Sequence, residues 1–260
     1  MPWWWKLVLA TGGMLLVMAA ARMGGRRVAG VMAALPTITA PTLALTAFEH
    51  GTGFAVHAAI GSVASCAALA MFALAYVHAS RRLAAAGALA CGLAAAVLAT
   101  LPAQEASQTL PAALVLALGF TALAWTALPA PCVAAVGALR ASRPSLLAAC
   151  AVGGLTVLAT TVGPAFGPFA TGLLASLPLV SGPIAMAEHT ASGHHACAEF
   201  LRGYVRGLFG KAVFGAVFAL LAPQAGALPA LALGVAAACA LELRPTWRRA
   251  PTRRLHSPSR

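Results

Sequence analysis

The chain has 260 residues, of which 61% are hydrophobic and only 8% are charged. With a mean hydropathy of +0.88, it lacks the polar surface that a soluble globular protein needs. A net charge of +12 would point to nucleic acid in a soluble protein, but in membrane proteins basic residues gather in cytoplasmic loops. We therefore expect an all-α, polytopic integral membrane protein with the lipid bilayer, and no nucleic acid, as its partner.

Nine apolar segments follow one another along the chain, each long enough to cross a bilayer as a helix of about 20 residues. The first ends in small residues that would suit a signal peptidase, but an apolar counterpart in the second half of the chain favours a retained membrane span. After the ninth, the Arg- and Pro-rich tail 244–260 is typical of a disordered basic segment near a membrane surface. The approximate ranges are 3–21, 28–48, 54–79, 83–101, 110–128, 145–162, 167–187, 194–222 and 225–243.

The basic residues indicate how the chain is oriented. With the N-terminus outside, sixteen of the seventeen Lys and Arg residues fall on the cytoplasmic side, and only Lys6 remains outside. This is the distribution that the positive-inside rule predicts. Lys211 lies slightly inside the eighth segment, so we expect its side chain to snorkel to the surface. The expected location is the bacterial cytoplasmic (inner) membrane, with the C-terminus in the cytoplasm.

A twelve-residue sequence occurs twice, as GVMAALPTITAP at 30–41 and as GLLASLPLVSGP at 172–183. The flanking apolar segments match at the same offset, so segments one to four correspond to segments six to nine. Five positions of the motif are identical, namely Gly30/Gly172, Ala33/Ala175, Leu35/Leu177, Pro36/Pro178 and Pro41/Pro183.

The duplication divides the chain into four parts. They are a four-helix membrane repeat (1–103), a connecting transmembrane helix with a cytoplasmic loop (104–144), a second four-helix repeat (145–243) and the tail (244–260). Because the connecting helix crosses the membrane once more, the second repeat enters from the opposite face. Inverted repeats of this kind are typical of secondary transporters, although duplicated membrane proteins also include channels and structural subunits.

The two proline motifs are the predicted substrate-binding site. Proline removes a backbone donor and disfavours helix just before itself, so each pair should open a helix near the middle of the membrane. The freed carbonyls need hydroxyl groups, water or protein as partners, and half-helix ends can face a solute. The alternative is a pair of kinks that only shape the bundle. The candidate residues are Pro36, Thr37, Thr39, Pro41, Pro178, Ser181 and Pro183.

A Glu-His pair follows each proline motif, and such pairs can relay protons because His titrates near neutral pH. The two pairs match only if a three-residue gap is allowed, whereas at the constant offset His57 aligns with Glu199. The alternative interpretation is a polar helix end at the level of the lipid headgroups. The candidate relay residues are Glu49, His50, His57, Glu188, His189 and Glu199.

Other chemistry finds less support. The set His189, His194, His195, Cys197 and Glu199 contains metal-ligating residue types but no H-E-x-x-H or C-x-x-C spacing, so we expect no metal site and no cofactor. The chain has no phosphate loop, no G-x-S-x-G and no Asp. We therefore do not expect an enzyme of the ATPase or hydrolase type.

The G-x-x-A-x-L-P motif, followed by a second Pro and an acidic residue, resembles small bacterial inner-membrane proteins of the GlpM type and related permease-like families. The resemblance implies a membrane protein with a Gly-rich loop before a proline-broken helix, here as a fused duplication. We expect a proton-coupled secondary transporter of a small solute; the alternatives are a membrane scaffold or assembly subunit and a metal-ion carrier. The resemblance rests on Gly24, Gly25, Gly30, Ala33, Leu35 and Pro36, and on Gly167, Gly172, Ala175, Leu177 and Pro178.

Overall fold

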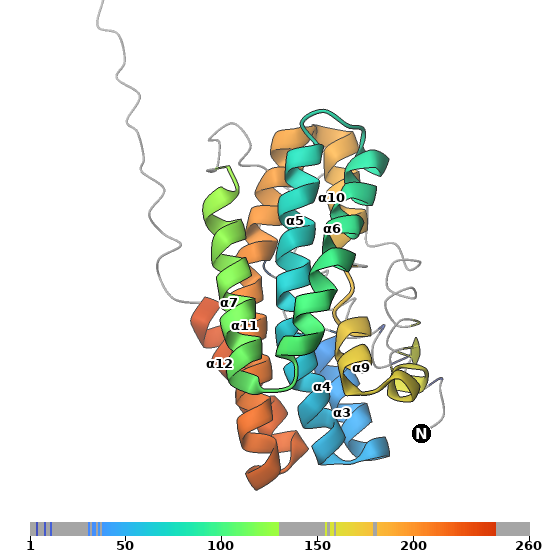
Figure 1. The fold of residues 1–260 in the computed structure, drawn as a ribbon, viewed down its shortest axis with the longest axis vertical. Coiled ribbons are helices and arrows are strands. Elements are labelled where there is room, and N and C mark those ends of the chain that lie inside the picture. Colours follow the sequence, from blue (N-terminus) through green and yellow to red (C-terminus); the bar gives the residue numbers. More distant parts are fainter. Residues whose placement is uncertain are drawn as a thin grey trace, which may run out of the picture.

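A computed structural model describes residues 38–129, 160–178 and 181–242, together with the single positions 4, 8, 11, 31, 33, 34, 36, 154, 157 and 158. These residues form helices and connecting turns, with no strand among them. Figure 1 shows the helices packed side by side along one long axis. The elements are α3 (Thr39–His50), α4 (Thr52–Ala64), α5 (Cys66–Ala79), α6 (Ala85–Ala106), α7 (Leu110–Ala127), the 3₁₀ turn η2 (Gly163–Phe166), α9 (Pro168–Leu174), α10 (Ser181–Ser192), α11 (His194–Ala225) and α12 (Ala227–Glu242).

Four helices of the described chain are long and apolar enough to cross a membrane. They are Thr52–Ala79, in which α4 and α5 follow one another directly, and α6, α7 and α11. With the shorter apolar helix α12, of 16 residues, they occupy five of the nine predicted segments. The predicted segments 3–21 and 145–162, the start of 28–48, and the tail 244–260 lie mostly outside the described residues, so the count of nine spans stays a prediction.

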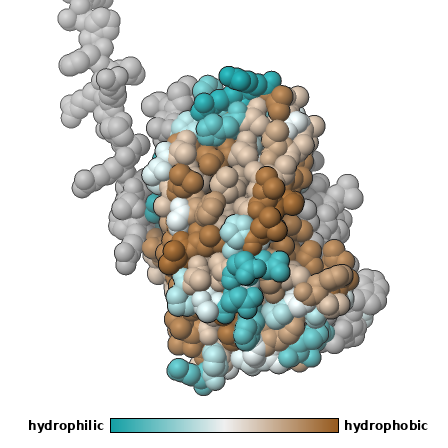
Figure 2. Space-filling model, in the orientation of Figure 1, coloured by the Kyte–Doolittle hydropathy of each residue, from teal (hydrophilic) through white to brown (hydrophobic). Residues whose placement is uncertain are grey.

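The helices differ in how much of their surface the protein covers. In the most apolar part of each span, 83% of the residues of Thr52–Ala79 are buried, against 28% in α6 and 22% in α7. Figure 2 shows a broad apolar area on the side of the molecule, with polar residues at its upper end and a second polar band lower down. An apolar surface of this extent fits lipid contact, so α4 and α5 form the centre and α6 and α7 the periphery of the bundle.

Both predicted proline breaks interrupt helices, and the prolines act in two ways. In the second copy α9 ends at Leu174 and α10 begins at Ser181, with Pro178 in the non-helical stretch between them. Pro183, however, is the third residue of α10, and Pro41 is the third residue of α3. Proline is tolerated in a first helical turn because the N–H groups there have no intrahelical partner. Only the first proline of each pair therefore lies in a break, and the second helps to start the next helix.

Helix boundaries recur at a constant spacing. The same sequence separation lies between the starts of α3 and α10, of α4 and α11, and of α6 and α12. The glycines that separate the first two helices of each set, Gly51 and Gly193, have φ of 87° and 82°, a conformation that favours glycine. The first residues of these helices are Thr39, Thr52 and Ala85 in one set and Ser181, His194 and Ala227 in the other.

Packing recurs at the same spacing as the helix boundaries. A Cβ atom at Gly92 of α6 would lie 2.9 Å from the Phe72 ring, and one at Gly234 of α12 would lie 3.0 Å from the Phe214 ring. In both cases a glycine lets the outer helix approach an aromatic side chain of a central helix. The two halves of the described chain therefore share a contact as well as a pattern of helices.

The two sets of helices run in opposite directions. The Ser80 hydroxyl, at the end of α5, lies 2.7 Å from Nδ1 of His194 at the start of α11. Further along α11, Gly215 packs against Val63 of α4. Helix α11 is therefore antiparallel to α4 and α5, and α3 and α10 lie towards opposite ends of the bundle (Figure 1).

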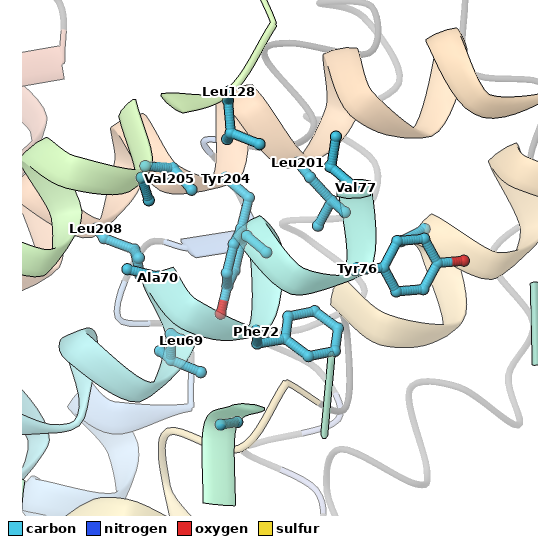
Figure 3. Packing of buried hydrophobic residues seen from close by; sticks show 14 of the residues in the cluster. Leu69, Ala70, Phe72, Tyr76, Val77, Leu128, Leu201, Tyr204, Val205 and Leu208 are labelled. Carbon is cyan, nitrogen blue, oxygen red and sulfur yellow. The ribbon is translucent and has the colours of Figure 1, made fainter. Parts of the chain in front are cut away.

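The core lies between the two central helices. Figure 3 shows Phe72 and Tyr76 of α5 packed with Leu201, Tyr204 and Val205 of α11. A second cluster of buried apolar residues joins α4 to the C-terminal half of α11. Lipid tails are as apolar as leucine, so helix association in a membrane depends on close packing and on small residues that allow backbones to approach.

Helix α9 lies directly on the backbone of α4. Gly172 of α9 faces Ala58 and Ser62 of α4, and a Cβ atom at Gly172 would lie 2.7 Å from the Ser62 backbone nitrogen. Such an approach is possible only for a residue without a side chain. Gly172 therefore fixes how closely the second proline break can lie to α4.

We predict that Gly172→Ala destabilises the protein. Because of this close contact, α9 would have to move away from α4, at a cost of about 1–3 kcal/mol. The measurement is the thermal unfolding temperature of the detergent-solubilised protein. Gly119→Ala is the matched control, because nothing lies within 4 Å of a Cβ atom there. An equal unfolding temperature for both variants would contradict the close packing of α9 on α4.

Candidate functional site

The two proline breaks meet at one small cavity inside the bundle. Its walls come from residues 33, 34, 38 and 39, from residues 175–177 and 181, and from α11. The cavity volume is about 20 Å³, which is room for one water-sized group. Segments that lie far apart in the sequence therefore line a single cavity.

Hydroxyl groups join the two breaks to each other and to α4. The Thr39 hydroxyl donates to the Ala175 carbonyl, at 3.4 Å. The Ser176 hydroxyl donates to the Gly172 carbonyl, at 2.7 Å, so its 3.0 Å bond with the Ser62 hydroxyl must have Ser62 as the donor. These bonds satisfy polar groups that an interrupted helix would otherwise leave unpaired in an apolar environment.

Two helices begin at the cavity. Thr39 is the first residue of α3 and Ser181 is the first residue of α10, and both residues line the cavity. Each helix has 12 residues, so each has a positive dipole end at the cavity wall. Ser181 is buried, and its hydroxyl faces the Tyr204 phenol without reaching hydrogen-bond geometry.

Lys211 is the basic residue among the described residues that line the cavity. It lies near the middle of α11, a helix of 32 residues, and only 5% of its surface is exposed. No carboxylate is among the described residues that line the cavity with it. The expectation that Lys211 snorkels to the cytoplasmic surface is therefore wrong, because its side chain lies inside the bundle beside the two proline breaks.

The predicted substrate-binding residues lie at different depths. Thr39 and Ser181 line the cavity. Pro36 and Pro178 are buried next to lining residues, whereas Pro41 is half-buried and Pro183 is exposed. The remaining candidate, Thr37, lies outside the described residues.

Three polar residues outside the repeated motif lie at or beside the cavity and were not predicted. They are Tyr204 and Lys211, which line it, and Ser62, which holds the second break. Tyr204 and Ser62 carry no signal in the sequence that separates them from other residues of their helices. The signal for Lys211 was its position, since an ionisable residue within an apolar helix marks a functional site by default.

The predicted relay residues form two groups at opposite ends of the bundle (Figure 1). Glu49, His50 and His57 are exposed at the end of α3 and the start of α4, and the His57 ring bonds to the Gly53 carbonyl, at 2.9 Å. The other group, in α10 and the start of α11, is more enclosed: Glu188 and Glu199 are buried and His189 is half-buried. Their role as a proton relay stays a prediction.

The His194 ring, at the start of α11, is held by a hydrogen bond to Ser80. The Ser80 hydroxyl donates to the Val77 carbonyl, so in its contact with His194 it accepts from an Nδ1–H group. The Cys197 thiol donates to the His194 carbonyl, at 3.1 Å. Among the described residues no three His, Cys, Asp or Glu side chains are grouped closely enough to hold a metal ion. The metal-carrier alternative therefore has no site in this part of the chain.

Arg202 and Arg206 fasten α11 to its neighbours. Arg202 donates to the Leu128 and Pro129 carbonyls after the end of α7, at 2.6 and 3.1 Å, and its guanidinium lies 4.3 Å from the Trp125 ring centre. A cation suits the unpaired carbonyls and the negative dipole of a helix C-terminus. Arg206 pairs with Glu242 at the end of α12, at 3.5 Å. Both arginines therefore have structural roles besides any effect on membrane orientation.

Comparisons with known proteins give no information about the function of this site. No family model matches the chain, and neither a curated protein nor a solved structure matches it. The resemblance to GlpM-type proteins therefore stays a prediction.

We predict that Glu242→Leu destabilises the protein and that adding Arg206→Met recovers part of the loss. The single change removes the carboxylate that faces the Arg206 guanidinium, which costs about 1–3 kcal/mol, whereas an apolar pair of similar volume avoids that cost. Thermal unfolding of the wild type, both single variants and the double variant completes the cycle. If the two changes shift the unfolding temperature additively, the interaction between Arg206 and Glu242 contributes nothing to stability.

Proposed function

We propose that the protein is a secondary transporter of a small solute, and that the cavity between the two proline breaks is its binding site. One observation carries the proposal: two interrupted helices from distant parts of the chain meet at a polar cavity inside an apolar bundle. Broken helices near the middle of the membrane form the substrate sites of many transporters. A bundle that served only as a scaffold would have no need for a lysine and two helix ends at its centre.

The repeated helix boundaries support an inverted duplication. The constant spacing of the helix starts, the matching glycines and the antiparallel course of α4–α5 and α11 are what a duplicated unit of opposite orientation would produce. In such a transporter the two halves exchange conformations, so the site opens to one side and then to the other.

Proton coupling and orientation form the remainder of the proposal. One Glu-His pair lies towards each end of the bundle, so each is placed to exchange protons with one side of the membrane. The positive-inside distribution puts the end with Glu188 and His189 in the cytoplasm and the end with Glu49 and His50 outside. The proposed location is the bacterial inner membrane.

We predict that cysteines at Thr39 and Ser181 react with small, polar methanethiosulfonate reagents in a variant without its native cysteines. Both residues are almost fully buried in this structure, with 2% and 1% of their surface exposed, so reaction requires water to reach the cavity in at least one state of the cycle. A condition that favours one state should change the two reaction rates in opposite directions.

The control for this scan is Ser65→Cys. Ser65 is as buried as Ser181, but it lies between α4 and α5 and does not line the cavity. Its cysteine should stay unreactive under all conditions. Equal and negligible reaction at Thr39, Ser181 and Ser65 would overturn the transporter proposal and favour the scaffold alternative.

A further inference from the structure

We propose that the solute is a small anion, held by the Lys211 ammonium between the first turns of α3 and α10. The inference rests on the proposed function insofar as it takes the cavity to be the transport site. It names the substrate class: a single negatively charged group, either an inorganic anion such as chloride or nitrate or the carboxylate of a small organic acid.

Lys211 is buried beside the two proline breaks, and no carboxylate lines the cavity with it among the described residues. Moving an ammonium group into an apolar environment is costly unless another group compensates for it. The chain has only five acidic residues, and no acidic residue is among the described residues around the cavity. Glu242, on the neighbouring helix α12, pairs with Arg206. The Cys66 thiol donates to the Ser62 carbonyl, at 3.6 Å, and is therefore not a negative partner for the lysine. An anion from outside the protein would supply the missing negative charge.

The N-terminal ends of α3 and α10 also favour an anion, independently of the lysine. The N-terminus of a helix favours negative charge through its dipole. The N–H groups of Ala40 and Gly182 donate to the Pro36 and Pro178 carbonyls, both at 2.8 Å, and the third residue of each helix is a proline without an N–H group, so the dipole is the main attraction. Thr39 and Ser181 place two such ends on the wall of the same cavity. A cationic solute would be repelled by all three groups, and a neutral one would leave the lysine uncompensated.

The cavity also has the size and the hydrogen-bond donors that suit a small anion. A cavity of about 20 Å³ holds one ion or one carboxylate head and little more. The wall offers hydroxyl donors from Ser181 and Tyr204, since the Ser181 hydroxyl has no hydrogen-bond partner among the described residues. Anion, lysine and hydroxyls would then satisfy one another.

The test compares Lys211→Met with Arg82→Met in purified full-length protein. Both variants lose one positive charge, but Arg82 is exposed in the turn after α5 and away from the cavity. The probes are the sodium salts of chloride, nitrate, formate and acetate. Glycerol is the neutral comparison, and tetramethylammonium sulfate is the cationic comparison, measured against sodium sulfate at the same sulfate concentration. The readouts are the thermal unfolding temperature in detergent and the uptake of the same probes into proteoliposomes.

At least one anion should raise the unfolding temperature of the wild type and of Arg82→Met, because a ligand that binds only the folded state stabilises it. The same anion should leave Lys211→Met unchanged. Without any probe, Lys211→Met should unfold at a temperature equal to or above that of the wild type, since it removes an uncompensated charge. Stabilisation by chloride or nitrate indicates an inorganic anion, and stabilisation by formate or acetate alone indicates a carboxylate.

The inference is overturned if none of the four anions stabilises the wild type, or if an anion stabilises Lys211→Met equally. The uptake of the probes into proteoliposomes distinguishes a wrong anion inference from a wrong transport function. Uptake of glycerol or tetramethylammonium that Lys211→Met leaves unchanged would support transport and overturn the anion. Anion binding that depends on Lys211, without uptake of any probe, would support the anion site and overturn transport.

Discussion

The structure depends on one constraint: inside an apolar bundle, every interrupted helix end and every charge needs a partner from within the protein or from a ligand. The two proline breaks meet this constraint largely by facing each other. Thr39 donates across to Ala175, and Ser62 and Ser176 tie the second break to α4. Among the described residues around the cavity, Lys211 is the group that this arrangement leaves without a carboxylate. The proposed anion follows from this uncompensated lysine, whereas the proposed transport function follows from the meeting of the two breaks.

The surrounding packing holds the breaks in place. Gly172 lets α9 lie on the backbone of α4, which brings the residues of the second break to the cavity. On the other side, Arg202 and Arg206 fasten α11 to the ends of α7 and α12, and so position the stretch of α11 that carries Tyr204 and Lys211. Small residues and ion pairs in the periphery thus determine the geometry at the centre. The same glycine–phenylalanine contact occurs in both halves of the described chain.

Much of this arrangement was predictable because it depends on local chemistry. Proline, hydrophobic length and a repeated motif predicted the apolar helices at 54–79, 83–101, 110–128 and 194–222, and placed a break in each copy of the motif. The role of each proline was not predictable from spacing alone: Pro36 and Pro178 lie in non-helical stretches, whereas Pro41 and Pro183 start helices. Whether a proline breaks or begins a helix depends on the tertiary contacts that satisfy the turn before it.

The lysine was misjudged for a different reason. A basic residue near the start of an apolar segment fits the positive-inside rule, and that rule says nothing about which face of a helix the residue occupies. Helix α11 begins at His194, where the predicted segment 194–222 begins, so the position of the helix start is not the source of the error. Only the packing of α11 against both breaks shows that the side chain is directed inward. The Glu188–His189 and Glu49–His50 pairs, in contrast, were found by pattern, and the count of spans and basic loops already predicted that they lie towards opposite sides of the membrane.

The central claim is that the two proline breaks lie in contact within one protein, and disulfide formation in native membranes tests it most directly. Thr39→Cys and Ala175→Cys, introduced together into a variant without native cysteines, should form an intramolecular disulfide under mild oxidation. Thr39→Cys paired with Gly119→Cys, on the exposed face of α7, should not. Absence of the first cross-link under conditions that oxidise exposed cysteine pairs would contradict the account, because the two breaks would then not share a cavity.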